Sequence, residues 1–208
     1  PVWEKMQLPA LAAAAIETNR KYCDYVCRTF HHQQVVLTDY KLERKQVYVA
    51  LANFSDAFQR MTNEPKQMQQ QAPYWQQLMV STHVFASHTA ALFSEIQELS
   101  NDHQLESFQP IAKQINNRLQ TAHGYLTQEK VALQPGAATG MENIAIRQEV
   151  KAVLAQRRYE LERGEWETNT KVKLVAVKSV LDQLDMMLQL SSNIRKVSRQ
   201  ITPKAIPH

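Results

Sequence analysis

The chain has 208 residues, of which 44% are hydrophobic and 21% charged, so a disordered tail is excluded. Only four residues are glycine and 23 are glutamine, a composition that favours helices over all-β or dinucleotide-binding α/β folds, whose tight turns need glycine. The net charge of +4 lies entirely within residues 142–208, which carry 12 basic and 8 acidic side chains.

The first two predicted helices cover residues 9–30 and 35–61. Pro9 fits the first turn of the first helix, and the second must end before Pro65, because the residue before a proline is pushed out of the helical region. The longest apolar run, residues 8–16, is far shorter than the roughly 20 residues that a membrane span needs.

Further helices are predicted after a glutamine-rich linker. Apolar residues recur three and four apart along the segment from Trp75 to Leu99, as expected for a helix with one buried face, and Gly164 is typical of a helix C-terminus. The sequence therefore predicts an all-α fold, an elongated antiparallel bundle of about six helices in a single domain over residues 1–208. The last four predicted helices cover residues 74–99, 108–130, 142–163 and 168–199.

Motifs for catalysis or metal binding are missing from the sequence. No Glu-x-x-His pair, His-Glu-x-x-His, phosphate-binding loop or nucleophile elbow occurs. Cys23 and Cys27 lie one helical turn apart, where a disulfide would distort the helix, so both are predicted to be reduced. The sequence therefore predicts no enzyme activity, no metal and no cofactor.

Arg44 breaks the apolar stripe of the second predicted helix, between Tyr40 and Val47. A guanidinium on a buried stripe needs a partner, so one interpretation is an internal ion pair with Glu95, Glu98, Asp182 or Asp185. A second has the stem packed and the head reaching solvent, and a third makes Arg44 an anion-binding residue. Arg157 is a similar exception on the fifth predicted helix. The basic end of the chain, Arg195 to Lys204, is either a phosphate contact or a set of cations that complement the helix dipole.

Residues 40–66 read YKLERKQVYVALANFSDAFQRMTNEPK. An Arg, an Ala-Leu-Ala-Asn-Leu-Ser-like run, Gln-Arg-Met and Glu-Pro follow one another in this segment, with Phe54 where the pattern has Leu. The segment resembles the cytoplasmic part of FUSC-family bacterial inner-membrane proteins of the YccS/YhfK type. On this resemblance Asn53, Glu64 and Pro65 belong to the structural motif.

The resemblance implies the C-terminal cytoplasmic domain of a FUSC-family efflux transporter for aromatic carboxylic acids of the fusaric acid type, acting in assembly, gating or ligand sensing at the cytoplasmic face of the inner membrane. Implied partners are the membrane part of the same polypeptide, a second copy in a homo-oligomer and a small aromatic carboxylate, with no nucleic acid. Arg44, Arg60 and Tyr40 are the candidate ligand-binding residues, because guanidinium groups bind carboxylates in bidentate fashion. The alternative is a free-standing helical scaffold that binds a protein or nucleic acid.

Overall fold

The computed structural model describes residues 2–31, 33–65, 69, 71–99, 103–128, 151, 154–166 and 168–201, and these residues contain no β-strand. The predicted all-α helical bundle is therefore confirmed. Residues 154–162 are also helical. The long helices with described bounds are α1 (Val2–Cys27), α2 (Leu37–Thr62), α3 (Ala72–Leu99), α4 (Gln109–Thr127) and α6 (Asn169–Ile201).

Where the structure describes them, the helix boundaries lie close to the predicted ones, except at the start of α1. This helix begins at Val2 and carries Pro9 inside it, so the expected start at Pro9 is wrong. The predicted start of the fifth helix at residue 142 lies outside the described residues. Two short 3₁₀ segments flank the long helices: Arg28–His31 follows α1, and His103–Phe108 leads into α4. Gly164 has φ of +75°, as predicted for a residue that ends a helix. The predicted loop over residues 133–140 lies outside the described residues.

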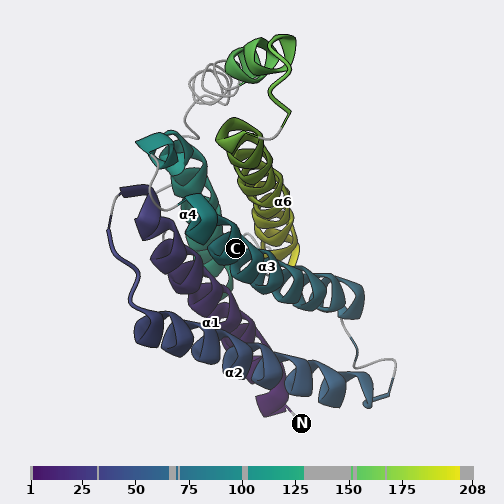
Figure 1. The fold of residues 1–208 in the computed structure, drawn as a ribbon. Coiled ribbons are helices and arrows are strands. Elements are labelled where there is room, and N and C mark those ends of the chain that lie inside the picture. Colours follow the sequence, from purple (N-terminus) through teal and green to yellow (C-terminus); the bar gives the residue numbers. More distant parts are fainter. Residues whose placement is uncertain are drawn as a thin grey trace.

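Four helices form the centre of the bundle (Figure 1), and α2 lies outside them. Helix α1 packs against α3 and α4, and α6 packs against α3 and α4 from the other side. Helix α2 lies across α1 and α3. Consecutive helices α1 to α4 alternate in direction, so α1 and α3 run parallel as neighbours because α2 is displaced to the outside.

The apolar stripe of α3 supplies the middle of the core. All eight residues of this stripe are buried: Trp75, Leu78, Thr82, Phe85, Thr89, Leu92, Ile96 and Leu99. The hydroxyls of Thr82 and Thr89 donate to the backbone carbonyls of Leu78 and Phe85. On α2, by contrast, Leu37 lies three residues before Tyr40 and continues the apolar stripe of that helix. It is nevertheless 55% exposed, because it is the first residue of the helix.

Helices α2 and α3 pack antiparallel through aromatic contacts, as expected from their short connection. The ring of Tyr40 stacks on Phe93 at 3.8 Å between centroids, and Phe54 meets Trp75 edge-on at 6.3 Å. The first contact lies near the start of α2 and the second near its end.

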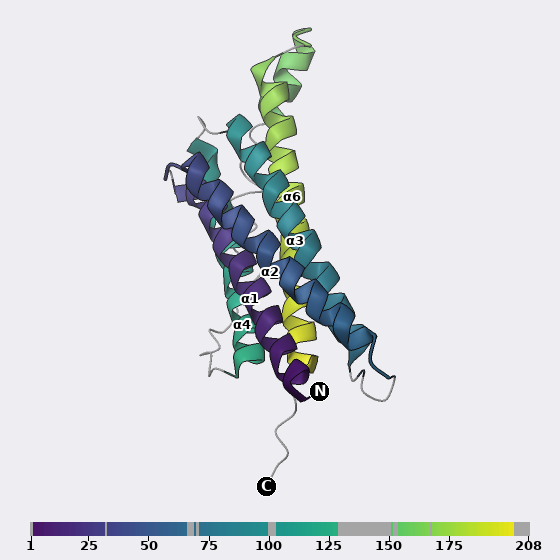
Figure 2. The same ribbon diagram turned by 90° about the horizontal axis from the view of Figure 1, so that it is seen from below.

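Different segments of the chain lie at the two ends of the bundle. The N-terminal end of α1 and the C-terminal end of α6 lie at one end (Figure 2), whereas residues 154–166 and the first turns of α6 project beyond the other helices at the opposite end. We call this projection, residues 154–175, the hairpin.

Candidate functional site

Tyr40 is part of a buried aromatic cluster that joins three helices. Its hydroxyl lies 3.0 Å from that of Tyr22 on α1, and the two rings are tilted at 5.6 Å between centroids, while Phe93 of α3 covers its other side. Burial, and secondarily the bond to Tyr40, raises the pKa of Tyr22, so Tyr22 stays a neutral phenol. The cluster fixes α1, α2 and α3 to one another, and the Tyr40 hydroxyl is already engaged.

Arg44 lies one turn further along α2 but is exposed, with its guanidinium carbon 5.6 Å from the ring centroid of Tyr48. A hydrogen-bonding interaction with Tyr48 is the main cause that raises the pKa of Arg44, and desolvation acts in the opposite direction. No carboxylate of the described side chains forms an ion pair with it. The interpretation of Arg44 as a buried ion-pair partner is therefore wrong for the described residues, and the side chain of Glu98 lies outside them.

Glu43, rather than Arg44, points toward the slot between Tyr40 and Val47. It is half-buried, and its Oε2 atom is buried with no hydrogen-bond partner among the described residues. The sequence pattern could not distinguish the two, because a residue three positions after Tyr40 and one four positions after it both lie near the same stripe.

Arg60 is exposed in the last turn of α2, where its charge complements the helix dipole. Sixteen residues separate it from Arg44, which is about 24 Å along a helix. The structure therefore brings Tyr40 and Arg44 together but places Arg60 apart from both.

Of the motif residues, Asn53 lies within α2, whereas Glu64 and Pro65 lie in the turn that follows it and that a glutamine stabilises. Asn53 and Pro65 are exposed, and Glu64 is half-buried. The side-chain amide of Gln69 donates to the backbone carbonyls of Thr62 at 2.8 Å and Glu64 at 2.7 Å. Sequence reasoning missed this role of Gln69, because a glutamine within a glutamine-rich linker carries no distinguishing signal.

His83 and His88 contact polar side chains of neighbouring helices, and the two cysteines are buried. The Nδ1 atom of His88 lies 2.7 Å from Oε1 of Gln183, and Nε2 of His83 lies 3.0 Å from the Ser55 hydroxyl, while burial lowers the pKa of His83. Cys23 and Cys27 are buried free thiols with their sulfur atoms 3.9 Å apart. Within the described part of the chain, no group of three or more His, Cys, Asp or Glu side chains could hold a metal ion.

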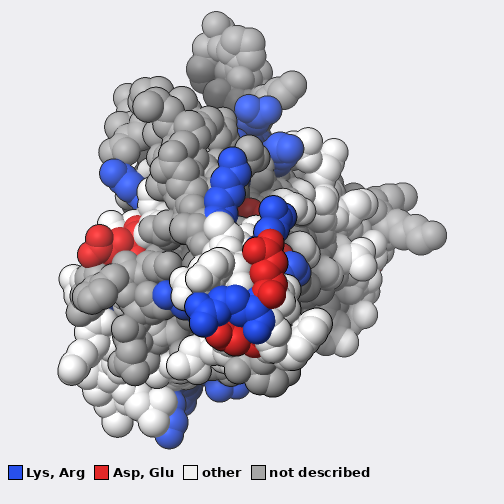
Figure 3. All heavy atoms as spheres, turned by 45° about the horizontal axis from the view of Figure 1, so that its top comes forward, with Lys and Arg blue, Asp and Glu red and all other residues white. Residues whose placement is uncertain are grey.

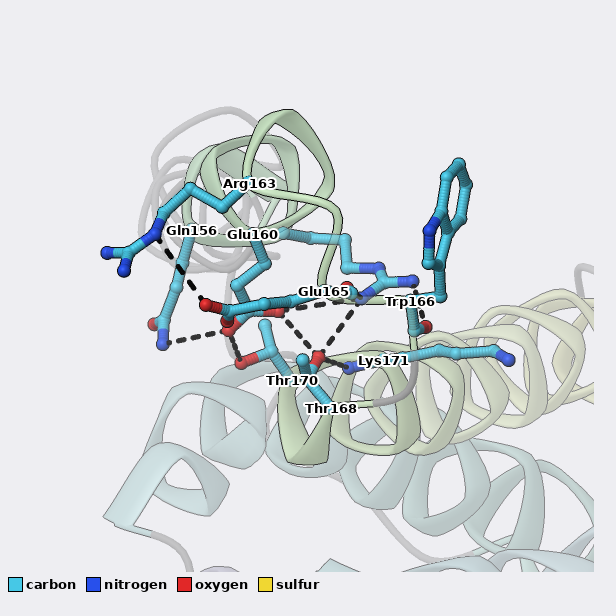
Figure 4. A network of polar contacts seen from close by, with 9 residues as sticks. Gln156, Glu160, Arg163, Glu165, Trp166, Thr168, Thr170 and Lys171 are labelled. Atoms are coloured by element: carbon cyan, nitrogen blue, oxygen red, sulfur yellow. Dashed lines mark hydrogen bonds and ion pairs between the residues drawn. The ribbon is translucent and has the colours of Figure 1, made fainter.

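Arg157 closes the turn of the hairpin, where Figure 4 shows Glu160, Thr168 and Thr170 close together. Its guanidinium donates to the carbonyls of Glu165 at 3.2 Å and Trp166 at 2.8 Å, and to the Thr168 hydroxyl at 3.0 Å. It also lies 3.6 Å from Glu160, with both side chains nearly buried. The exception that Arg157 makes in the sequence pattern is thus explained, because the guanidinium satisfies backbone carbonyls that the turn leaves unpaired.

Glu160 completes this network from the same helix. Its carboxylate accepts hydrogen bonds from the hydroxyls of Thr168 and Thr170, both at 2.6 Å. These two bonds, and then the bond to Arg157, hold the pKa of Glu160 below its usual range. The network fixes the hairpin turn, from which the Trp166 ring points away and is 68% exposed.

Comparison with known proteins finds a similarity to the inner membrane protein YccS of Escherichia coli (strain K12). The two sequences are 23% identical over 202 residues, which is 97% of this chain but 24% of the relative, so the chain spans about a quarter of the relative's length. No family model matches the chain, and no solved structure matches it. Within the described residues, every helix is too short or too polar to cross a bilayer.

Proposed function

We propose that this chain is a non-catalytic cytoplasmic domain of a FUSC-type inner-membrane exporter, in which it holds parts of the assembly together and couples their movements. The observation that carries the proposal is the similarity to YccS, which extends over 97% of this chain but only 24% of a protein named for the inner membrane. Most of the relative has no counterpart here, and the proposed partner of this domain is that membrane part within the same polypeptide.

The stiffness of the bundle supports a coupling role. Helices α1 and α6, with 26 and 33 residues, are about 39 and 50 Å long. Side-chain hydrogen bonds fix their registers: Arg20 donates to Asn116 on α4 at 3.0 Å, and Arg118 donates to the Leu188 carbonyl on α6 at 2.8 Å. Because these bonds resist sliding, a displacement applied at one end of α1 is shared by the neighbouring helices.

Charge at one end of the bundle supports an orientation. Arg195, Lys196 and Arg199 lie in the last turns of α6, at the end where α1 begins (Figure 2). Lys and Arg side chains near a cytoplasmic membrane surface are attracted to anionic lipid headgroups. We therefore orient this end toward the membrane and the hairpin away from it.

An assembly role fits the candidate residues better than ligand sensing does. Arg44 and Arg60 are too far apart to bind one small aromatic carboxylate, and the Tyr40 hydroxyl already bonds to Tyr22. Arg44 over the ring of Tyr48 remains the proposed contact if such an anion binds. On the face shown in Figure 3, Lys and Arg side chains lie among Asp and Glu side chains, which supports a protein rather than a nucleic acid partner.

The test is an export or resistance assay on the full-length parent protein after deletion of the segment that corresponds to residues 1–208. Insertion of the truncated membrane part is checked by fractionation and by an epitope at its remaining terminus. We expect export to be lost while insertion is retained. Unchanged export in a truncated protein that inserts normally would show that the domain is dispensable, and the coupling role would be wrong.

A further inference from the structure

The outer face of α6 carries an apolar stripe that no other described helix covers. Val172 and Val175 are each 64% exposed, and Met186 is 43% exposed, with the small Ser179 between them. These positions follow one another three, four and seven residues apart, so they lie on one side of the helix. A row of valines and a methionine in contact with water is typical of an interaction surface.

Exposed valines on α3 lie beside this stripe of α6. Asn193 of α6 donates to Ser81 of α3 at 2.9 Å, and Gln183 bonds to His88 at 2.7 Å, so the two helices are antiparallel and Val84 lies a little beyond Met186, toward the C-terminal end of α6. Val80 and Val84 are 51% and 38% exposed on the outer side of this helix pair. We call the surface formed by Val80, Val84, Val172, Val175 and Met186, with Ser179 at its centre, the α3–α6 face.

Charged side chains beside this stripe are arranged by sign along α6. Lys171 and Lys178 lie in the first half, and Asp182 and Asp185 follow on the same flank. Lys178 forms an exposed contact of 3.0 Å with Asp182 in the same chain, a kind of pair that contributes little and can exchange partners. The flank is therefore basic at one end and acidic at the other.

This order is self-complementary about Ser179. A two-fold axis through Ser179 that reverses the helix places Val172 opposite Met186 of a second copy. The same operation puts Lys171 within about 3 Å, along the helix axis, of the level of Asp185, and Lys178 equally near that of Asp182.

We propose that the α3–α6 face binds a second copy of this chain through an antiparallel, two-fold contact centred on Ser179. The contact buries the exposed valines and Met186 of both copies and forms each Lys–Asp pair twice. The small side chain of Ser179 lets the two helices approach closely at the axis. This inference deepens the assembly role proposed above and rests on it only for its biological setting.

The test measures the mass of the 208-residue chain in solution by sedimentation over a range of concentrations, with three variants. Val175→Glu places a charge in the centre of the stripe and should abolish dimerisation. Lys178→Asp sets Asp against Asp182 of the other copy and should weaken the dimer about tenfold or more. The double variant Lys178→Asp with Asp182→Lys restores opposite charges across the axis and should restore the dimer.

A cysteine at the axis tests the geometry. Ser179→Cys should give a covalent dimer under mild oxidation, whereas Asp56→Cys, exposed on α2 and outside this face, should not. Cys23 and Cys27 are buried and do not interfere. Circular dichroism verifies that each variant is folded.

Three results would overturn the proposal: a chain that stays monomeric, a dimer that Val175→Glu leaves intact, or a double variant that fails to restore the contact. None of these alters the outcome expected from deleting the whole domain in the parent protein. Conversely, unchanged export after that deletion would contradict the coupling role even if the dimer forms.

Discussion

Tyr22 and Tyr40 illustrate at the scale of single residues how buried hydroxyls specify a contact between helices. Each is nearly inaccessible to water, and each has the other as its hydrogen-bond partner at 3.0 Å. A buried polar group costs free energy unless it is bonded, so this pair favours one register of α1 against α2 over others.

The two tyrosines should therefore be energetically coupled. We expect Tyr22→Phe to lower the free energy of unfolding by about 1–2 kcal/mol, because the Tyr40 hydroxyl is left unpaired. The double variant with Tyr40→Phe should cost less than the sum of the single changes. Denaturant unfolding of the four proteins measures this difference, and strict additivity would show that the hydroxyls do not interact.

Arg44 is exposed, so its removal should change the stability of the protein only slightly. Arg44→Ala should change the free energy of unfolding by less than about 1 kcal/mol, as is usual for surface residues. Removal of one partner from a buried ion pair would instead cost about 3–5 kcal/mol. A denaturant melt distinguishes the two cases, with Lys45→Ala, an exposed neighbour on the same helix, as the matched control.

At the scale of elements, the hairpin depends on its polar network rather than on a core. Most side chains described for residues 154–166 are exposed, including Leu154, Tyr159 and Leu161. The bonds that Glu160 accepts from Thr168 and Thr170 therefore hold its two arms together, with Arg157 closing the turn.

The hairpin should loosen in acid. Since these hydrogen bonds lower the pKa of Glu160 in the folded chain, their stabilisation is present above the ordinary glutamate pKa and is lost as pH falls through the lowered value. The side-chain signals of Thr168 and Thr170 in NMR spectra should titrate in that acidic range. Glu160→Gln should remove this titration and speed amide exchange in residues 154–162 at neutral pH, whereas exchange in α3 should stay unchanged.

At the scale of the whole molecule, one described core joins residues from all five long helices, with α3 in its middle. Phe85→Ala should lower the free energy of unfolding by about 3–5 kcal/mol, because Phe85 is fully buried and its loss leaves a cavity. Tyr74→Ala, an aromatic change on the same helix at a position 39% exposed, should cost much less. Equal losses in calorimetric or denaturant unfolding would contradict this description of the core.

The sequence by itself determined the helices. Glycine scarcity, prolines and the three-and-four spacing of apolar residues located α2, α3, α4 and α6 within a few residues, because these signals act locally along the chain. The same periodicity identified the buried face of α3. The FUSC-like segment pointed to a relationship that the similarity to YccS supports, over nearly the whole chain but only a quarter of the relative.

Only the tertiary structure decided which side chain occupies each slot between helices. Glu43 and Arg44 both fit the stripe of α2 by spacing, and only the packing of α1 and α3 against α2 turned Arg44 outward. The structure also explained Arg157, whose acceptors lie up to eleven residues away, and it left Val172, Val175 and Met186 exposed on α6. Periodicity shows that a residue lies on one side of its own helix, whereas burial and hydrogen bonding depend on helices that are distant in the sequence.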